Sequence, residues 1–334
     1  MDFMSKILDL MDGRVLFTLV IGNTKTAEIP GITVAGANMD LIKYTPPADS
    51  ELLYHGRCLS IDFIPATPDG KPTPALISYT ALRLTKIPLL VVDSGLLVKP
   101  KIPHLTLSAP VGGNIAVERA MSYEVAKNVI ENGKILGEQL SKLADLLVIG
   151  ESIPAGTTTA GAVLKALGFE PKVSSSMPTN PVELKRNVIE QAVKRVQSKD
   201  PIEIISAVGD PVMAGVVGIL SGCKRALLAG GTQMVAIANL AKRITDCEIA
   251  IATTEFVAKD KTADLSLAPC EVFVSKIPLA NSKYPGLRAY AEGFVKEGVG
   301  AGGLTLFALK RGISEERLLA EIERDYEKIV LRKQ

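Results

Sequence analysis

Aromatic and metal-binding side chains are scarce in this chain of 334 residues. It contains no tryptophan, only two histidines and four cysteines, and aromatic residues make up 4% of it. The cysteines are widely spaced and form no C-x-x-C pair; they are Cys58, Cys223, Cys247 and Cys270. This spacing predicts buried free thiols in a reducing compartment, which we expect to be the cytoplasm, and no metal site.

The chain also lacks an excess of charge of either sign and any long hydrophobic run. It has 38 Lys and Arg residues against 36 Asp and Glu, a net charge of +2. Without a basic run, or tryptophan for base stacking, nucleic acid is not an expected partner. The longest uncharged apolar stretches, such as residues 226–241, are too short for a membrane span, and the N-terminus has no signal-peptide pattern. We therefore expect no membrane partner and no secretion.

Hydrophobic residues make up 47% of the chain and recur as short apolar runs that end at polar or glycine-rich breaks. Such runs, which do not alternate with polar residues, are typical of parallel strands covered on both faces. We expect these strands at residues 88–92, 146–149, 202–208, 225–228 and 249–251. Helical periodicity predicts helices at residues 117–143, 158–167 and 181–197. The pattern predicts an α/β, Rossmann-like fold: a mostly parallel sheet, right-handed crossovers and helices on both faces.

The two ends of the chain follow a different pattern and predict a small additional region. We expect strands at residues 15–21 and 32–35, and ordered loops at residues 40–57 and 96–113. A charged amphipathic helix is expected at residues 314–331. Ser314 is its expected N-cap, and acidic residues follow in its first turn.

One loop, between the apolar run 146–149 and the helix expected from residue 158, has the composition of a nucleotide site. It begins with Gly150-Glu151 and continues with Gly156 and three threonines. Backbone N–H groups and hydroxyls at a helix start can bind an anion such as phosphate. Because Glu151 would repel a bare phosphate, we expect it to face a ribose hydroxyl or a cationic ring. The alternative is that the Gly and Thr residues serve turn geometry and capping alone.

A second segment places several glycines around a single carboxylate, Glu297. It is not a dinucleotide fingerprint, because that motif follows a strand and residues 286–295 are expected to be helical. A carboxylate facing an apolar cavity has a raised pKa and can accept a proton from a weakly acidic N–H. The alternative is that Glu297 is a solvated loop residue. Glu292, four residues before Lys296, is expected to form an exposed ion pair.

Together these segments resemble, over residues 85–310 and in the same order, the nicotinate-nucleotide–dimethylbenzimidazole phosphoribosyltransferase family in its archaeal-type branch. The loop from Gly150-Glu151 to Gly156-Thr157-Thr158 is similar to the family's Gly-Glu-x-x-x-Gly-Asn-Thr-Thr loop, which holds the nucleotide. Residues 296–301, Lys-Glu-Gly-Val-Gly-Ala, are similar to its Gly-Glu-Gly-Ser-Gly-Ala segment, which carries the proposed general base. Further similar segments are Asp93-Ser94-Gly95, Ser174-Ser175-Ser176, Lys185, Gly209-Asp210 and Ala229-Gly230-Gly231.

Three positions depart from the family pattern. Thr157 stands where the family has Asn, Ser94 where it has His, and Phe294 where it has Arg, although Lys296 could supply the missing charge. These departures leave the accepting base open: dimethylbenzimidazole, another benzimidazole or a purine.

The resemblance implies transfer of 5-phosphoribose from nicotinate mononucleotide to a benzimidazole-like base. The products would be nicotinate and an α-ribotide, α-ribazole 5'-phosphate, for assembly of the lower ligand of cobamides. Glu297 would be the general base, and Glu151 would hold ribose hydroxyls or stabilise positive charge. Phosphate contacts are implied for Gly156, Thr157, Thr158, Thr159, Ser174, Ser175, Ser176 and Lys185. Other substrate contacts are implied for Asp93, Ser94, Gly209, Asp210, Gly230, Gly231, Gly298 and Gly300.

The resemblance also implies a cytoplasmic homodimer that needs no cofactor, because a donor without pyrophosphate needs no Mg²⁺. Residues 85–310 would form the nucleotide-binding catalytic domain, and residues 1–84 and 311–334 would pack on it or on a partner subunit. A non-catalytic nucleotide sensor or assembly protein of the same fold is the main alternative. A dehydrogenase or kinase is disfavoured, since the chain has neither a strand-linked G-x-G-x-x-G nor a GKT or GKS loop.

Overall fold

A parallel β-sheet forms the centre of the computed structural model, which describes residues 7, 9 and 11–331. In the described residues the sheet has seven strands in the order β3-β2-β1-β4-β5-β6-β7, and every neighbouring pair is parallel. The strands are β1 (Val15–Ile21), β2 (Leu89–Asp93), β3 (Leu105–Thr106), β4 (Leu146–Ser152), β5 (Arg225–Ala229), β6 (Glu248–Thr254) and β7 (Val272–Ser275). The expected α/β fold with a mostly parallel sheet is confirmed.

The strand order reverses at β1, which lies between β2 and β4. The N-terminal strand is thus inside the main sheet. In open parallel sheets, ligands bind outside the carboxyl ends of the strands where the order reverses. The loops that follow β1 and β4 are therefore the first place to look for a site.

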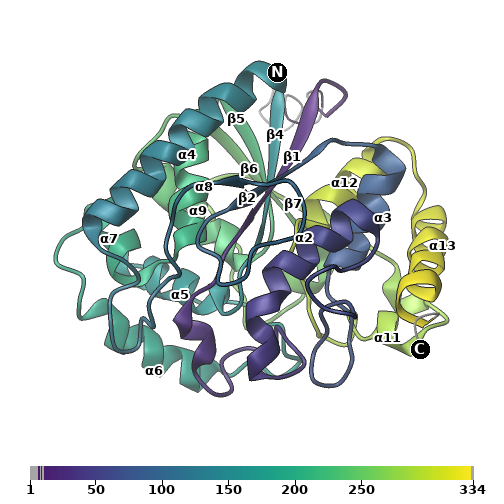
Figure 1. Cartoon of the computed structure of the whole chain (residues 1–334), viewed down its shortest axis with the longest axis horizontal. Coiled ribbons are helices and arrows are strands. Elements are labelled where there is room, and N and C mark those ends of the chain that lie inside the picture. Colours follow the sequence, from purple (N-terminus) through teal and green to yellow (C-terminus); the bar gives the residue numbers. More distant parts are fainter. Residues whose placement is uncertain (1–6, 8, 10, 332–334) are drawn as a thin grey trace.

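Helices cover both faces of the sheet (Figure 1). One face carries α4 (Tyr123–Leu143), α5 (Gly156–Ala166), α6 (Val182–Val193), α7 (Pro201–Val208), α8 (Pro211–Ser221) and α9 (Thr232–Ala241). The other carries α2 (Thr45–His55), α3 (Ala75–Thr85), α12 (Ala301–Lys310) and α13 (Glu315–Tyr326). Short helices α10 (Glu255–Ala258) and α11 (Pro285–Arg288) follow β6 and precede α12. Strand β1 supplies both cores, since Phe17 and Leu19 point to the second face and Val20 to the first.

Glycine brings two helices on the first face into close contact. A Cβ at Gly137 of α4 would lie 2.2 Å from the carbonyl oxygen of Ile219 in α8, and one at Gly133 would lie 2.8 Å from that of Gly215. The two backbones therefore meet without side chains between them. No helix in the described part of the chain is long and apolar enough to cross a membrane.

Several expected elements differ from the structure. Residues 202–208 are helix α7 instead of a strand, because Pro201 occupies the first turn and the Asp200 side chain accepts hydrogen bonds from the next N–H groups. An apolar run buried on all sides has no periodicity that separates helix from strand. Residues 40–57, expected as a loop, contain a 3₁₀ helix (Met39–Tyr44) and α2, whose prolines fit its first turn.

Other differences are smaller. Residues 32–35 are not a strand, and the helix expected over 286–295 is limited to α11. Strand β7 and helices α3 and α12 were not expected. The C-terminal helix is confirmed: Ser314 caps α13 by accepting from the Arg317 N–H, and residues 327–331 continue it as a π-helical turn. Cys58, Cys223 and Cys247 are buried free thiols as expected, and Cys270 is half-buried.

Candidate functional site

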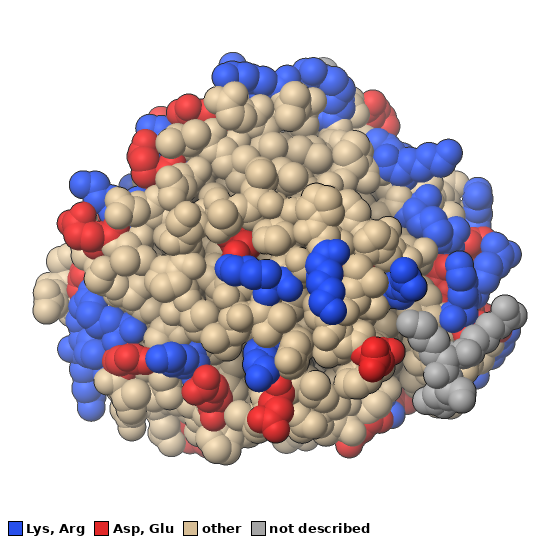
Figure 2. Space-filling model, viewed as in Figure 1, with Lys and Arg blue, Asp and Glu red and all other residues tan. Residues whose placement is uncertain are grey.

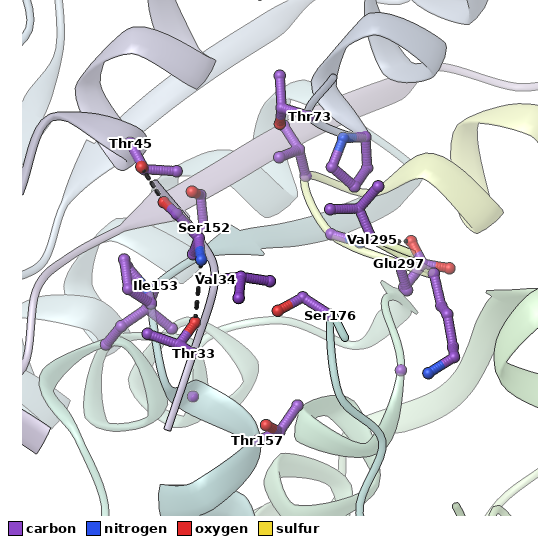
Figure 3. Close-up of a pocket in the computed structure, with 18 of the residues that line it drawn as sticks. Thr33, Val34, Thr45, Thr73, Ser152, Ile153, Thr157, Ser176, Val295 and Glu297 are labelled. Carbon is purple, nitrogen blue, oxygen red and sulfur yellow. Dashed lines mark hydrogen bonds between the residues drawn. The ribbon is translucent and has the colours of Figure 1, made fainter. Parts of the chain in front are cut away.

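A pocket of about 860 Å³, including its open mouth, lies at the carboxyl ends of the central strands. Its wall combines the loops after β1, β4 and β5 with segments far away in the sequence (Figure 3). The lining residues come from segments 33–35, 45–49, 65–74, 151–157, 174–176, 231–233, 257 and 295–299. The pocket therefore lies where the topology predicts a ligand site.

Glu297 projects into this pocket from a tightly curled loop. The backbone is left-handed at Val295 (φ 40°) and Val299 (φ 55°), which is uncommon for β-branched residues. This curl lets one carboxylate oxygen accept hydrogen bonds from the N–H groups of Gly298 and Gly302, both at 3.1 Å. The other oxygen accepts from the Thr254 N–H at 2.8 Å. Burial outweighs these bonds and raises the pKa of Glu297 to about 7.

Glu151 lies near the end of β4 in the wall of the same pocket. Burial, followed by the negative charges of Asp210 and Glu297, raises its pKa to about 8. Its backbone oxygen accepts a hydrogen bond of 2.9 Å from the Val299 N–H, which ties the β4 loop to the Glu297 loop. Two carboxyls 146 positions apart in the sequence thus share one cavity and sense each other's charge.

The other end of the pocket is formed by the start of α5 and the serine loop at 174–176. Helix α5 begins after Ala155, whose backbone is left-handed (φ 63°), and has no side-chain cap. Lys185 lies behind the wall and donates hydrogen bonds to the Thr157 hydroxyl at 3.0 Å and to the Ser174 carbonyl at 2.6 Å. Burial, followed by the charge of Lys296, lowers the pKa of Lys185 to about 7. A helix start, hydroxyls and an amine suit an anion here.

Lys296 holds the serine loop in place. Its ammonium is buried, forms an ion pair with Asp260 at 3.1 Å, and donates to the carbonyls of Ser175 and Met177, both at 3.0 Å. The expected exposed pair between Glu292 and Lys296 is therefore wrong, because the lysine turns inward to unsatisfied carbonyls. The described residues contain no group of three His, Cys, Asp or Glu side chains suited to a metal.

Comparison with known proteins identifies the family of this chain. Residues 77–247, about half of the chain, match the model of a family described as phosphoribosyltransferase. The chain belongs to this phosphoribosyltransferase family. A UPF0284 protein of Archaeoglobus fulgidus is 69% identical over 97% of this chain and 96% of its own. A UPF0284 protein of Sulfolobus acidocaldarius is 47% identical, and the match covers 96% of each chain. One of Pyrococcus furiosus is 44% identical, and the match covers 95% of this chain and 99% of its own.

Two solved structures from Thermus thermophilus share the fold. One is a nicotinate-nucleotide–dimethylbenzimidazole phosphoribosyltransferase, with a TM-score of 0.64 and 18% identity over 92% of this chain and 83% of its own. The other is a CobT, with a TM-score of 0.59 and 19% identity over 92% of this chain and 84% of its own. At this identity the likeness supports the fold.

Sequence-predicted residues of this phosphoribosyltransferase fall into two sets. Those that line the pocket are Glu151, Gly156, Thr157, Ser174, Ser175, Ser176, Gly231, Glu297 and Gly298. Those that do not line it are Asp93, Ser94, Thr158, Thr159, Lys185, Gly209, Asp210, Gly230 and Gly300. Asp210 supports the wall from behind: it accepts from the Thr159 hydroxyl at 2.6 Å, and burial raises its pKa to about 6.

Two of the residues that do not line the pocket, Ser94 and Asp93, have structural partners after β2. The Ser94 hydroxyl donates to the Pro211 carbonyl at 2.6 Å, which links the end of β2 to α8. Asp93 accepts from the Gly95 and Leu96 N–H groups, both at 3.0 Å, and pairs with Lys99. These contacts shape the loop after β2.

Sequence reasoning missed the part of the pocket that comes from the N-terminal region. The missed lining residues include Thr33, Thr45, Asp49, Lys71, Thr73, Ser152 and Gln233. Ser152 directly follows Glu151 and belongs to the same glycine- and threonine-rich loop. Gln233 lies just after the Ala229-Gly230-Gly231 segment. The remaining missed residues lie in N-terminal stretches with no motif, so only the folded chain brings them to the site of this phosphoribosyltransferase.

Proposed function

We propose that this phosphoribosyltransferase moves 5-phosphoribose from nicotinate mononucleotide to a ring nitrogen of a benzimidazole-like base. The observation that carries the proposal is the meeting of Glu151 and Glu297 in one pocket, with an anion-suited helix start at its other end. The products are nicotinate and an α-ribotide, of the kind used for the lower ligand of cobamides.

The reaction needs little beyond positioning and one base. The bond from C1' of ribose to the pyridinium nitrogen breaks, and its electron pair neutralises the ring, so nicotinate leaves without an acid. A ring nitrogen of the accepting base attacks C1' from the opposite face, which inverts that carbon. Glu297 then accepts the proton of the attacking ring. Base catalysis of this kind contributes about 10²–10⁴-fold.

The two carboxyls differ in their expected charge at neutral pH. Glu297, with a pKa of about 7, is ionised in a large fraction of molecules and suits the base. Glu151, with a pKa of about 8, is mostly protonated and suits a hydrogen bond to a ribose hydroxyl. When it ionises, its charge favours the positive charge that develops on the sugar.

The 5'-phosphate is assigned to the end of the pocket formed by Thr157, the serine loop at 174–176 and the start of α5. Lys185 holds two of these groups and adds positive charge behind them. Binding of the remote phosphate positions C1' between the two carboxyls.

The decisive experiment incubates the purified protein with nicotinate mononucleotide and a panel of aromatic bases, in EDTA, and detects nicotinate and ribotide by mass spectrometry. Release of both products in equal amounts is the expected result. Binding of the nucleotide without release, measured by calorimetry, would instead favour a non-catalytic sensor. Strict dependence on added Mg²⁺ would point to a different donor.

The same proposal includes a homodimer. Figure 2 shows an area without charged side chains in the upper central part of one face. The edge strand β3 exposes Leu105, and Leu97 is 53% exposed in the preceding loop. Light scattering should give about twice the 35.5 kDa mass of one chain, and a mass of one chain would contradict the dimer.

A further inference from the structure

One end of the pocket presents hydroxyls whose protons are already donated to the protein. The Thr73 hydroxyl donates to one oxygen of Asp49 at 2.7 Å, and the Ser152 hydroxyl donates to the other at 2.8 Å. The Thr45 hydroxyl donates to the Ala35 carbonyl. In Figure 3 Thr45, Ser152 and Thr73 lie above and Thr157 below, with Ser176 between them.

Asp49 is the centre of this group. Its side chain is buried, and Thr45 lies one turn before it on α2, on the same helix face. No Lys or Arg in the described residues forms an ion pair with Asp49; its side-chain partners are the two hydroxyls. Lys71, which also lines the pocket, holds its ammonium 5.5 Å from the centre of the Phe294 ring. Burial raises the pKa of Asp49 to about 7, so the side chain is ionised in a large fraction of molecules at neutral pH. This carboxylate has lone pairs beyond its two hydroxyl bonds and no cation beside it among the described residues.

These contacts determine whether this end of the pocket offers hydrogen-bond donors or acceptors to a ligand. A hydroxyl has one proton, so one that donates to the protein can only accept from a ligand. A carboxylate accepts through both oxygens. Thr45, Ser152 and the ionised form of Asp49 therefore face the cavity as acceptors. The Thr73 hydroxyl also accepts, but one of its lone pairs is taken by the Ala75 N–H at 3.2 Å. A ligand N–H or O–H would pair with their remaining lone pairs and stabilise the ionised carboxylate, whereas a ligand without a donor would leave those lone pairs unused.

The geometry points to this end as the subsite for the accepting base, with Asp49 as the specificity-determining residue for a base that carries an amino group on its ring. The inference rests on the proposed function, because it assigns the acceptor of that reaction. An aminated heteroaromatic ring, such as adenine or an aminobenzimidazole, donates N–H bonds to this group. Dimethylbenzimidazole would place methyl groups against it.

The test compares matched bases that differ only in the amino group. Adenine is paired with purine, and 5-aminobenzimidazole with benzimidazole, with nicotinate mononucleotide as donor. We expect kcat/KM to be at least about tenfold higher for the aminated member of each pair, since sites built to hydrogen-bond a group reject analogues that lack it. Equal values within a pair, with turnover intact, would overturn the inference and leave the proposed function standing.

Two variants link the preference to these residues. In Asp49→Asn the new amide donates to one of the hydroxyls, which frees that hydroxyl's proton to point into the pocket; the ratio within each pair should fall toward one. Thr45→Val removes one acceptor without touching Asp49, and should lower the ratio to a smaller extent. Thermal unfolding of both variants checks folding. A preference that is unchanged in a folded Asp49→Asn variant contradicts the assignment.

Calorimetry with the bases alone separates the two proposals. If no base supports nicotinate release but adenine binds more tightly than purine in an Asp49-dependent manner, the subsite stands and the proposed function fails. If neither adenine nor purine binds and no base reacts, both the subsite assignment and the proposed function are contradicted.

Discussion

The carboxyls of Glu151 and Glu297 acquire their chemistry from burial more than from their hydrogen bonds. Glu297 accepts three backbone N–H bonds, which lower its pKa, yet desolvation still raises the value to about 7. Glu151 is raised to about 8 by burial and by its acidic neighbours. A group whose pKa lies near the working pH is suited to proton transfer.

Substitution of Glu297 by Gln should lower turnover at least tenfold while nucleotide binding persists, because the amide cannot accept the proton. In the wild type, kcat/KM should rise with pH through about 7 as Glu297 ionises. Product formation against pH, with calorimetry for nucleotide binding, measures both. Glu292→Gln, at an exposed position nearby, is the matched control. A Glu297→Gln variant with full turnover would remove Glu297 from the base role.

Lys185→Met should lower kcat/KM for nicotinate mononucleotide by about tenfold or more, since a charge-assisted contact to the phosphate end is lost. The effect should depend on the phosphate. Nicotinate riboside, the same donor without phosphate, should therefore react equally with the variant and the wild type. Steady-state kinetics with both donors measure the difference. An equal loss for both donors would show that the lysine acts by supporting the fold instead.

At the scale of elements, close helix contacts and loop curvature place the site. Helix α8 carries Asp210 at its N-cap, and α8 is fixed against α4 by backbone contact at Gly133 and Gly137. The Glu297 loop keeps its curl partly through Gly300 (φ 78°), where a Cβ would lie 2.7 Å from the Phe17 ring of β1. Close packing at these glycines therefore fixes the positions of α8, which carries Asp210, and of the loop that carries Glu297.

Gly137→Ala should destabilise the protein, by about 1–3 kcal/mol, because the added Cβ would lie 2.2 Å from the Ile219 carbonyl oxygen. Helix propensity alone predicts the opposite, a gain of about 1 kcal/mol. Chemical denaturation measures the sign. Glu131→Ala, at an exposed position of the same helix, should change stability by less than about 0.5 kcal/mol. A stabilised Gly137→Ala variant would mean that the two helices separate easily.

At the scale of the whole molecule, four acidic side chains are buried in or beside the pocket, and burial disfavours their ionised forms. Burial is the largest cause of the raised pKa of Asp49 (about 7), Asp210 (about 6), Glu151 (about 8) and Glu297 (about 7). A carboxyl whose pKa is raised on folding contributes stability at low pH, and loses it as pH rises through the folded value. Lys185, with a lowered pKa of about 7, opposes this trend only above that pH.

The melting temperature should therefore fall between pH 5 and pH 7, on the order of 5 °C. Thermal unfolding across that range measures the slope. Glu151→Gln should flatten the slope and be more stable than the wild type at pH 7, because it removes the most strongly raised of the four acids. A melting temperature that rises from pH 5 to pH 7 would contradict the buried-acid picture.

The amino-acid sequence by itself determined the α/β class, strands β1, β2, β4, β5 and β6, and the two acidic loops, because apolar runs and glycine clusters are local signals. It did not distinguish α7 from a strand, since a run buried on every side loses its periodicity.

Only the tertiary structure decided that β1 is central and that Thr45, Asp49 and Thr73 reach the pocket. It also decided that Lys296 turns inward. The position of β1 depends on which strands pair, and the position of Lys296 depends on which carbonyls need a hydrogen-bond donor. Both are contacts between residues far apart in the chain, so short sequence patterns do not predict them.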